Sequence, residues 1–205
     1  SPGNGAYDGK PSIDGTAEMR LGTWLARDIP HTGMASQIDV SGGIHYTHKA
    51  VPGQRLARHA LKNQYGKKDL VADGPMFKSY TVQGDKVIIE FDHAEGGLVV
   101  AGTAYNAIGR HEDSTGYAEP KVIPNGDDQV KLFFLAGEDR VWHPATAKVK
   151  GSDQVVVSAE AVPAPVAVRY AWSNNPIRPN LGNSLRLPAS PFRTDNWPGP
   201  TRDSL

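Results

Sequence analysis

Short runs of β-branched and aromatic residues, separated by turn-forming residues, occupy the chain from residue 73 to residue 172. QGD joins the runs MFKSYTV and KVIIEFDH, and GSD joins ATAKVK and QVVVSAE; both are connections typical of tight hairpins. LVVAG, QVKLFFLAG and VAVRYAW continue the pattern at similar spacing. Roughly seven short strands spaced in this way predict an antiparallel β-sandwich.

Two segments interrupt or follow this pattern. Residues 103–126 form a long insertion between strand-like runs, and we expect a surface loop there. After Trp172 the chain is rich in Asn and Pro, so we expect it to run extended over the surface. We therefore take residues 73–205 as a β-sandwich domain with an extended C-terminal tail.

The first 72 residues have a different pattern. Residues 1–15 are rich in Gly, Pro, Asn and Asp and predict a loop. A helix is expected from Thr16 to Pro30, because apolar residues at helical spacing predict one buried face: Leu21, Trp24, Leu25 and Ile29. A short strand is expected from Met34 to Val40. A second helix is expected from Pro52 to Tyr65, ended by Gly66, with an apolar face formed by Leu56, Ala60 and Leu61. This order predicts an α/β arrangement that is too short for a complete sheet.

The composition excludes several classes of function. Lys and Arg together number 22, as do Asp and Glu, so the net charge is zero and neither nucleic acid nor an anionic membrane is an expected partner. No apolar run approaches the roughly 18 residues of a membrane span. The chain has no cysteine, which excludes disulfide scaffolds, zinc ribbons and cysteine nucleophiles.

Two of the seven histidines lie in the stretch GGIHYTHKAVPG, between the expected strand and the second helix. His45 is either a catalytic base or a solvated loop residue, and its position on a loop favours the second reading when the residues are taken alone. With His48 it forms an H-x-x-H spacing that could hold a metal only on a helix. Two glycines oppose that geometry and no third ligand is nearby, so no metal site is expected.

Other charged and aromatic residues have structural explanations that compete with functional ones. Glu138, Asp139 and Arg140 form either a charged turn or a ligand contact, and the turn is favoured. Three tryptophans could stack on a sugar ring or pack in the core and pin the tail: Trp142, Trp172 and Trp197. Arg193 and Asp195 are expected to form a structural ion pair or a cap. No catalytic role is expected for His59, His93, His111 or His143.

Several motifs in order resemble those of the sialate O-acetylesterases, a branch of the SGNH (GDSL-like) hydrolases. HTGMASQIDVSGGIHYTHKAVPGQRLARHAL is similar to the end of that family's catalytic domain. GPMFKSY, EFDHAEGGL, LAGEDRVWHPATAKVKG, VAVRYAWSNNP and LPASPFRTDNW also match, and the last is the most distinctive. The resemblance covers most of the chain, from about Glu18 to Trp197.

The resemblance implies a carbohydrate esterase that hydrolyses O-acetyl groups from sialic acid or related sugars by a Ser-His mechanism without a cofactor. The implied fold is the C-terminal part of a flavodoxin-like SGNH hydrolase domain (residues 1–72), followed by the antiparallel β-sandwich (73–205). His45 takes the position of the family's general base. The implied partners are an acetylated carbohydrate and the part of the enzyme, or the second chain, that supplies the serine. A secreted, periplasmic or lysosomal-like location is also implied.

The sequence departs from the family pattern in two ways. The Gly-Gln-Ser-Asn-like motif that carries the serine is not in this chain, so the chain is similar only to the C-terminal part of the enzyme. Gly43 and Tyr46 stand where many members have Asp and Pro around the Ile-His pair. The nearest acid is Asp39, a possible orienting residue for His45, and a backbone carbonyl is the alternative. Other readings are a non-catalytic β-sandwich that binds carbohydrate or serves as an accessory module, and a degenerate, inactive hydrolase.

Overall fold

The computed structural model describes residues 15–40, 49–104, 121–124, 128–174, 176 and 179–199. The described residues form two α-helices, one short 3-10 helix and eleven strands. The helical elements are α1 (Thr16–Leu25), η1 (Ala26–Asp28) and α2 (Ala50–Asn63). The strands are β1 (Met76–Gln83), β2 (Lys86–Asp92), β3 (Leu98–Ala104), β4 (Lys121–Pro124), β5 (Phe133–Ala136), β6 (Trp142–Pro144), β7 (Thr146–Lys150), β8 (Gln154–Ser158), β9 (Ala167–Tyr170), β10 (Leu181–Asn183) and β11 (Phe192–Arg193).

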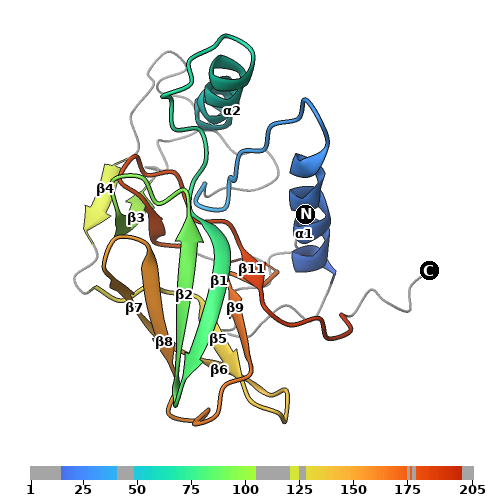
Figure 1. Cartoon of the computed structure of the whole chain (residues 1–205), viewed down its shortest axis with the longest axis vertical. Helices are drawn as coiled ribbons and strands as arrows, with labels where there is room; N and C mark the ends of the chain where they lie inside the picture. The colour runs from blue at the N-terminus through green and yellow to red at the C-terminus, as the bar shows by residue number, and fades with distance from the viewer. Residues whose placement is uncertain are drawn as a thin grey trace, which may run out of the picture.

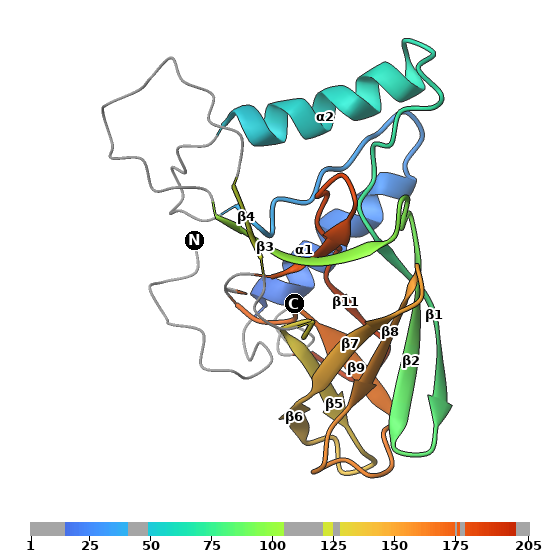
Figure 2. The same cartoon turned by 90° about the vertical axis from the view of Figure 1, so that its left-hand side faces the viewer.

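The strands form three antiparallel sheets, in the orders β1-β2-β8-β7, β11-β9-β5-β6 and β10-β3-β4. The helices lie to one end and one side of these sheets (Figures 1 and 2). The two predicted hairpins are confirmed. Gln83 pairs with Lys86 across the first turn, and Gly84 there has a φ of 64°. Gly151, in the turn between β7 and β8, has a φ of 68°, a conformation that glycine adopts without strain. The β-rich part of the fold prediction is therefore confirmed.

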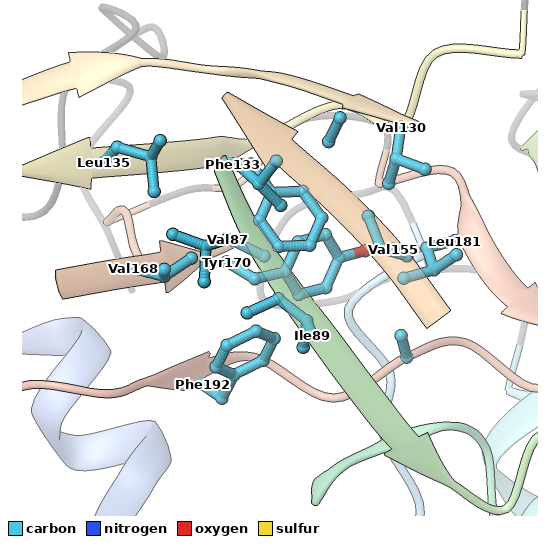
Figure 3. Packing of buried hydrophobic residues seen from close by; sticks show 14 of the residues in the cluster. Val87, Ile89, Val130, Phe133, Leu135, Val155, Val168, Tyr170, Leu181 and Phe192 are labelled. Carbon is cyan, nitrogen blue, oxygen red and sulfur yellow. The ribbon is translucent and has the colours of Figure 1, made fainter. Parts of the chain in front are cut away.

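The core lies where the two four-stranded sheets contribute side chains to one cluster (Figure 3). On β2 buried and less buried residues alternate, so that Val87, Ile89 and Phe91 point inward. Aromatic rings from the other sheet meet them, and the Phe133 and Tyr170 ring centroids are 4.8 Å apart. Alternation along the strands therefore places one face of each sheet in a shared apolar interior.

The C-terminal tail is part of this core, so the expectation that it runs over the surface is wrong. Leu181, Ala189 and Phe192 are buried in the main cluster, and the tail contributes β10 and β11 to two of the sheets. The buried Asn183 amide donates to the backbone oxygens of Asp73 and His93, at 3.1 and 3.3 Å. Apolar residues at intervals within the Pro-rich segment are what draw it into the interior.

Part of the long insertion forms a β-strand. Lys121–Pro124 forms β4 and pairs with β3, with Ala101 opposite Pro124 and Ala104 opposite Lys121. Residues 105–120 and 125–127 lie outside the described part of the chain. The prediction of a surface loop throughout 103–126 is therefore wrong for these four residues and for Thr103 and Ala104 of β3, because the two strands complete a ladder with each other.

The helical part differs from the sequence prediction in three ways. Residues 34–40 do not form a strand, because they pair with no described strand; Val40 instead donates to Gln37 O within a turn, at 3.1 Å. In α1 only Ala17 is buried, and Leu25 is 55% exposed. In α2 the expected apolar face points outward, with Leu56 50% exposed. The end of α2 agrees with the prediction, since Gly66 has a φ of 71°.

Candidate functional site

His45 lies within residues 41–48, the segment expected from the sequence to be a loop, and this segment is outside the described part of the chain. Gly43, Tyr46 and His48 lie in the same stretch, so their placement stays a prediction, as does the catalytic role of His45. The structure does describe both flanks of the loop. The segment ending at Val40 leads into it, and Lys49 follows it at the start of α2. The described part of the candidate site is therefore its two flanks.

A buried ion pair joins these two flanks. Arg55 of α2 donates from Nη1 to Asp39 Oδ1 at 2.7 Å and from Nη2 to Asp39 Oδ2 at 2.6 Å. The same Nη1 also donates to Ser36 O at 2.6 Å. The two side chains are only 8% and 4% exposed. Such a bidentate arrangement fixes the direction of both groups, so it fixes the distance between the beginning of the loop and the second turn of α2.

The same face of α2 makes further polar contacts with the body of the molecule. His59 is buried, and its Nε2 lies 3.9 Å from Asp73 Oδ1. Arg58 donates to Val71 O at 2.9 Å. A Cβ atom on Gly33 would lie only 2.9 Å from His59 Cβ, so the segment before residues 34–40 packs closely against the helix. His59 is thus a buried packing residue of α2, and no described contact gives it a catalytic role.

Asp39 also influences the electrostatics of the sandwich core. Burial raises the pKa of the Tyr170 phenol well above its usual range, and the negative charge of Asp39 acts in the same direction. Tyr170 belongs to β9 in the centre of the core cluster. The Asp39 carboxylate therefore lies where the helical part meets the sandwich, and Arg55 neutralises it there.

A cavity of about 450 Å³ lies between α1, residues 34–40 and the segment after β9. Its walls are mostly apolar and include Trp24, Met34, Ile38 and Trp172. Arg20 lines it as well, and it donates to the backbone oxygens of Ser173 and Asn174. These contacts bind α1 to the end of β9 and leave an apolar hollow beside the segment that leads toward His45.

Arginines and tryptophans pack together at the outer side of β9. The Arg169 guanidinium lies 4.3 Å from the centroid of the Trp142 ring and 5.6 Å from that of Trp172. The Trp142 and Trp197 rings are 5.3 Å apart. Arg140 lies 5.3 Å from the Trp197 ring. Each ring therefore packs against an arginine or another tryptophan, which is an arrangement that pins the tail rather than a free platform for a sugar.

Asp195 completes this cluster. Arg169 donates to both of its carboxylate oxygens, at 2.9 and 2.8 Å, and Arg193 Nη1 lies 3.9 Å from Oδ1. The expected pair of Arg193 and Asp195 is present, but Arg169 is the closer partner. The charged turn expected near Arg140 is also present between β5 and β6, with Arg140 N donating to Gly137 O at 3.0 Å.

The other histidines form no second site among the described residues. His93 lies 3.7 Å from Glu95, His143 is half-buried on β6, and His111 is outside the described residues. Among the residues that the structure places, no group of His, Asp or Glu side chains is arranged to hold a metal ion. None of the described helices is both long enough and apolar enough to span a bilayer.

Reasoning from the sequence missed Arg55, which is the most informative residue at the site. A signal for it was present, because Val51, Arg55 and His59 recur every four residues and share one face of α2. An arginine on a buried face requires an acid partner. Asp39, in the adjoining segment, was the nearest candidate.

No protein-family model and no curated protein matches the chain. Among solved structures, a carbohydrate acetylesterase from Xanthomonas citri superposes with a TM-score of 0.74 and 35% sequence identity. The match covers 96% of this chain. This chain is therefore similar in sequence and fold to a carbohydrate acetylesterase. It spans only 39% of the length of the Xanthomonas citri enzyme, so the larger part of that enzyme has no counterpart here.

Proposed function

We propose that this chain is the histidine-bearing part of a carbohydrate acetylesterase that removes O-acetyl groups from sialic acid or a related sugar. The observation that carries the proposal is the 35% identity with the Xanthomonas citri acetylesterase over 96% of the chain. The ordered motifs that resemble the sialate O-acetylesterases support the more specific substrate. The flavodoxin-like origin of residues 1–72 belongs to the same proposal.

The proposed reaction is an acyl transfer in two steps. A serine hydroxyl, from a part of the enzyme outside residues 1–205, attacks the acetyl carbonyl while His45 accepts its proton. His45 then gives the proton to the sugar oxygen that leaves, and the acetyl group stays on the serine. In the second step His45 activates a water molecule, which releases acetate and restores the serine. Histidine is suited to both steps because its pKa lies near neutral pH.

Asp39 is the proposed orienting residue for this histidine. An imidazole base needs its second nitrogen, or the loop that carries it, held in one orientation. The Arg55 ion pair supports the assignment, because it immobilises the Asp39 carboxylate at the beginning of the His45 loop and ties the end of that loop to it. Asp39 is thus a positioning residue in this proposal, and a secreted or periplasmic setting is the proposed location of the reaction.

The test is turnover of an aryl acetate and of an O-acetylated sialic acid by the complete enzyme that contains this chain. His45→Ala is expected to lower kcat at least about 100-fold, the lower end of what a positioned base contributes. His48→Ala, three residues along the same loop, is the matched control and is expected to leave kcat within a factor of a few. Unchanged turnover in His45→Ala with an intact fold would overturn the proposal.

A second measurement uses residues 1–205 alone. Without a nucleophile this chain is expected to show no hydrolysis of the aryl acetate above background. Robust hydrolysis that a single Ser→Ala change within the chain abolishes would show that the serine lies inside residues 1–205, and the division of the machinery would then be wrong.

A further inference from the structure

The helix α2 has its polar side facing the protein and its apolar side facing outward. Its buried residues are Val51, Arg55 and His59. All of its exposed residues are uncharged: Ala50, Gly53, Gln54, Leu56, Ala57, Ala60, Leu61 and Asn63. Leu56 and Leu61 are 50% and 41% exposed. A surface helix normally has the opposite arrangement, with its apolar stripe toward the core.

The arrangement in space agrees with this reading. Figure 2 shows α2 along the outer edge of the molecule, with residues 30–40 and the sandwich on one side and no described helix or strand on the other. The inward side is held by the contacts of Arg55 and Arg58 with Asp39, Ser36 and Val71. These directional hydrogen bonds set the rotation of the helix, so the leucines cannot turn inward without breaking them.

A second feature lies beside the helix. Residues 34–37 form neither a helix nor a turn, and they join no β-ladder with any described strand. In the chain order of an α/β layer, the segment between two helices is where a strand is expected, and parallel strands of such a layer normally pair on both sides. Among the described residues there is therefore neither a strand that pairs with this segment nor an element that covers the outward side of α2.

We infer that the outward face of α2, formed by Leu56, Leu61 and the small residues between them, is the docking surface for the serine-bearing part of the enzyme. The inference rests on the proposed function. The serine-bearing part is the expected partner because the larger part of the Xanthomonas citri acetylesterase lies outside the region that matches this chain. A strand of the same part pairs with residues 34–37, so that docking completes the sheet and brings the serine to the His45 loop at the start of α2.

The test uses single thiols, which are informative because residues 1–205 contain no cysteine. Leu61→Cys is compared with Val82→Cys on β1, which is exposed to a similar degree (43%) but lies in the sandwich. Each variant is made in residues 1–205 and in the complete enzyme, and the rate of maleimide labelling is measured by mass spectrometry of the labelled peptide. Leu61→Cys is expected to react at least tenfold more slowly in the complete enzyme, and Val82→Cys at the same rate in both.

Equal labelling rates at Leu61→Cys in the two proteins would overturn the inference. Slow labelling already in residues 1–205, together with a dimer in sedimentation, would show that a second copy covers the face and would also overturn it. A charged residue introduced on this face provides an independent test of the docking surface. Leu56→Glu combined with Leu61→Cys is expected to leave the unfolding midpoint of residues 1–205 unchanged and to abolish the protection of the thiol in the complete enzyme. Val82→Glu combined with Leu61→Cys is the control and is expected to leave that protection intact.

The result is separable from the proposed function. Protection of Leu61→Cys in an enzyme whose turnover survives His45→Ala would keep the docking surface and reject the catalytic assignment. Loss of turnover in His45→Ala without protection of Leu61→Cys would keep the catalytic assignment and reject the docking surface.

Discussion

The Arg55 guanidinium holds both carboxylate oxygens of Asp39 across sixteen residues of sequence, at 2.7 and 2.6 Å. The pair closes the segment that contains the His45 loop, and both side chains are almost fully buried. An ion pair in this position gains little over an apolar pair of similar size, but it is costly to break from one side only. Its main consequence is therefore geometric: it sets where the loop begins, where α2 starts and which face of α2 points outward.

Removing one partner of this pair is expected to destabilise the protein strongly. Arg55→Met leaves the Asp39 carboxylate buried without its cation, which is expected to lower the free energy of unfolding by about 3–5 kcal/mol. The double variant Asp39→Ala/Arg55→Met is expected to lose less than the sum of the two single variants, because no unpaired charge remains. Urea denaturation of residues 1–205 measures all three.

The exposed pair of Arg27 and Asp28, with side chains 35% and 69% exposed, is the control for that experiment. Arg27→Met is expected to change stability by less than about 1 kcal/mol, because solvent screens such a pair. An Arg55→Met variant as stable as Arg27→Met would mean that the buried pair does not hold the loop flanks together.

Asp39→Asn in the complete enzyme tests whether Asp39 orients His45. The amide keeps the shape but not the charge, so a positioning role predicts a lower kcat and a shifted pH profile of kcat, with KM for the acetate ester little changed. The measurement is turnover across pH 5–9, at a temperature where circular dichroism shows the variant folded. A pH profile identical to that of the parent enzyme would argue against any influence of Asp39 on the histidine.

Stability is expected to fall at high pH because of Tyr170. Burial raises the pKa of this phenol in the folded state, while in the unfolded state it stays near its ordinary value of about 10. Below pH 10 the phenol is protonated in both the folded and the unfolded state, so its full contribution to the stability of the folded state is present. Above pH 10 the unfolded state loses the proton first, so stability falls by up to about 1.4 kcal/mol per pH unit.

Tyr170→Phe removes the phenol, so the difference between this variant and the parent chain gives the contribution of Tyr170 to the pH dependence of stability. Urea midpoints measured between pH 9 and 11.5 are expected to fall less steeply in Tyr170→Phe than in the parent chain. Tyr80→Phe, at a position 40% exposed on β1, is the matched control and is expected to keep the parent slope. Identical slopes in all three proteins would show that the Tyr170 phenol ionises as readily in the folded state as in the unfolded chain.

Two glycines are expected to respond in opposite directions to the same change. A Cβ on Gly74 would lie 2.2 Å from Pro188 O, so Gly74→Ala must displace the backbone of the tail, at a cost of about 1–3 kcal/mol. A Cβ on Gly22 in α1 meets nothing within 4 Å, so Gly22→Ala is expected to stabilise the helix by about 0.5–1 kcal/mol. Thermal unfolding of both variants checks this, and a Gly74→Ala variant as stable as the parent would show that residues 187–188 do not press against Gly74.

The sandwich could be predicted from the sequence because its information is local. Alternation along runs such as KVIIEFDH selects one inward face, and the turns QGD and GSD impose hairpin pairing between neighbours. The candidate site could be predicted from the sequence only in part. The helix after His45 was predicted from the sequence. The strand expected before His45 is not formed, and the partner of Asp39 was not predicted.

Tertiary structure alone decided the direction of α2, the burial of the tail and the pairing of Asp39. The apolar face of α2 was read correctly from its period, but that period does not say whether the face meets the core or a partner. Buried hydrogen bonds from Arg55 settled the rotation of the helix. The tail was misread because its Asn and Pro residues suggest a surface coil, while Leu181 and Phe192 fill the remaining space between the sheets. Such choices depend on contacts between residues far apart in the chain, and local sequence patterns carry no record of them.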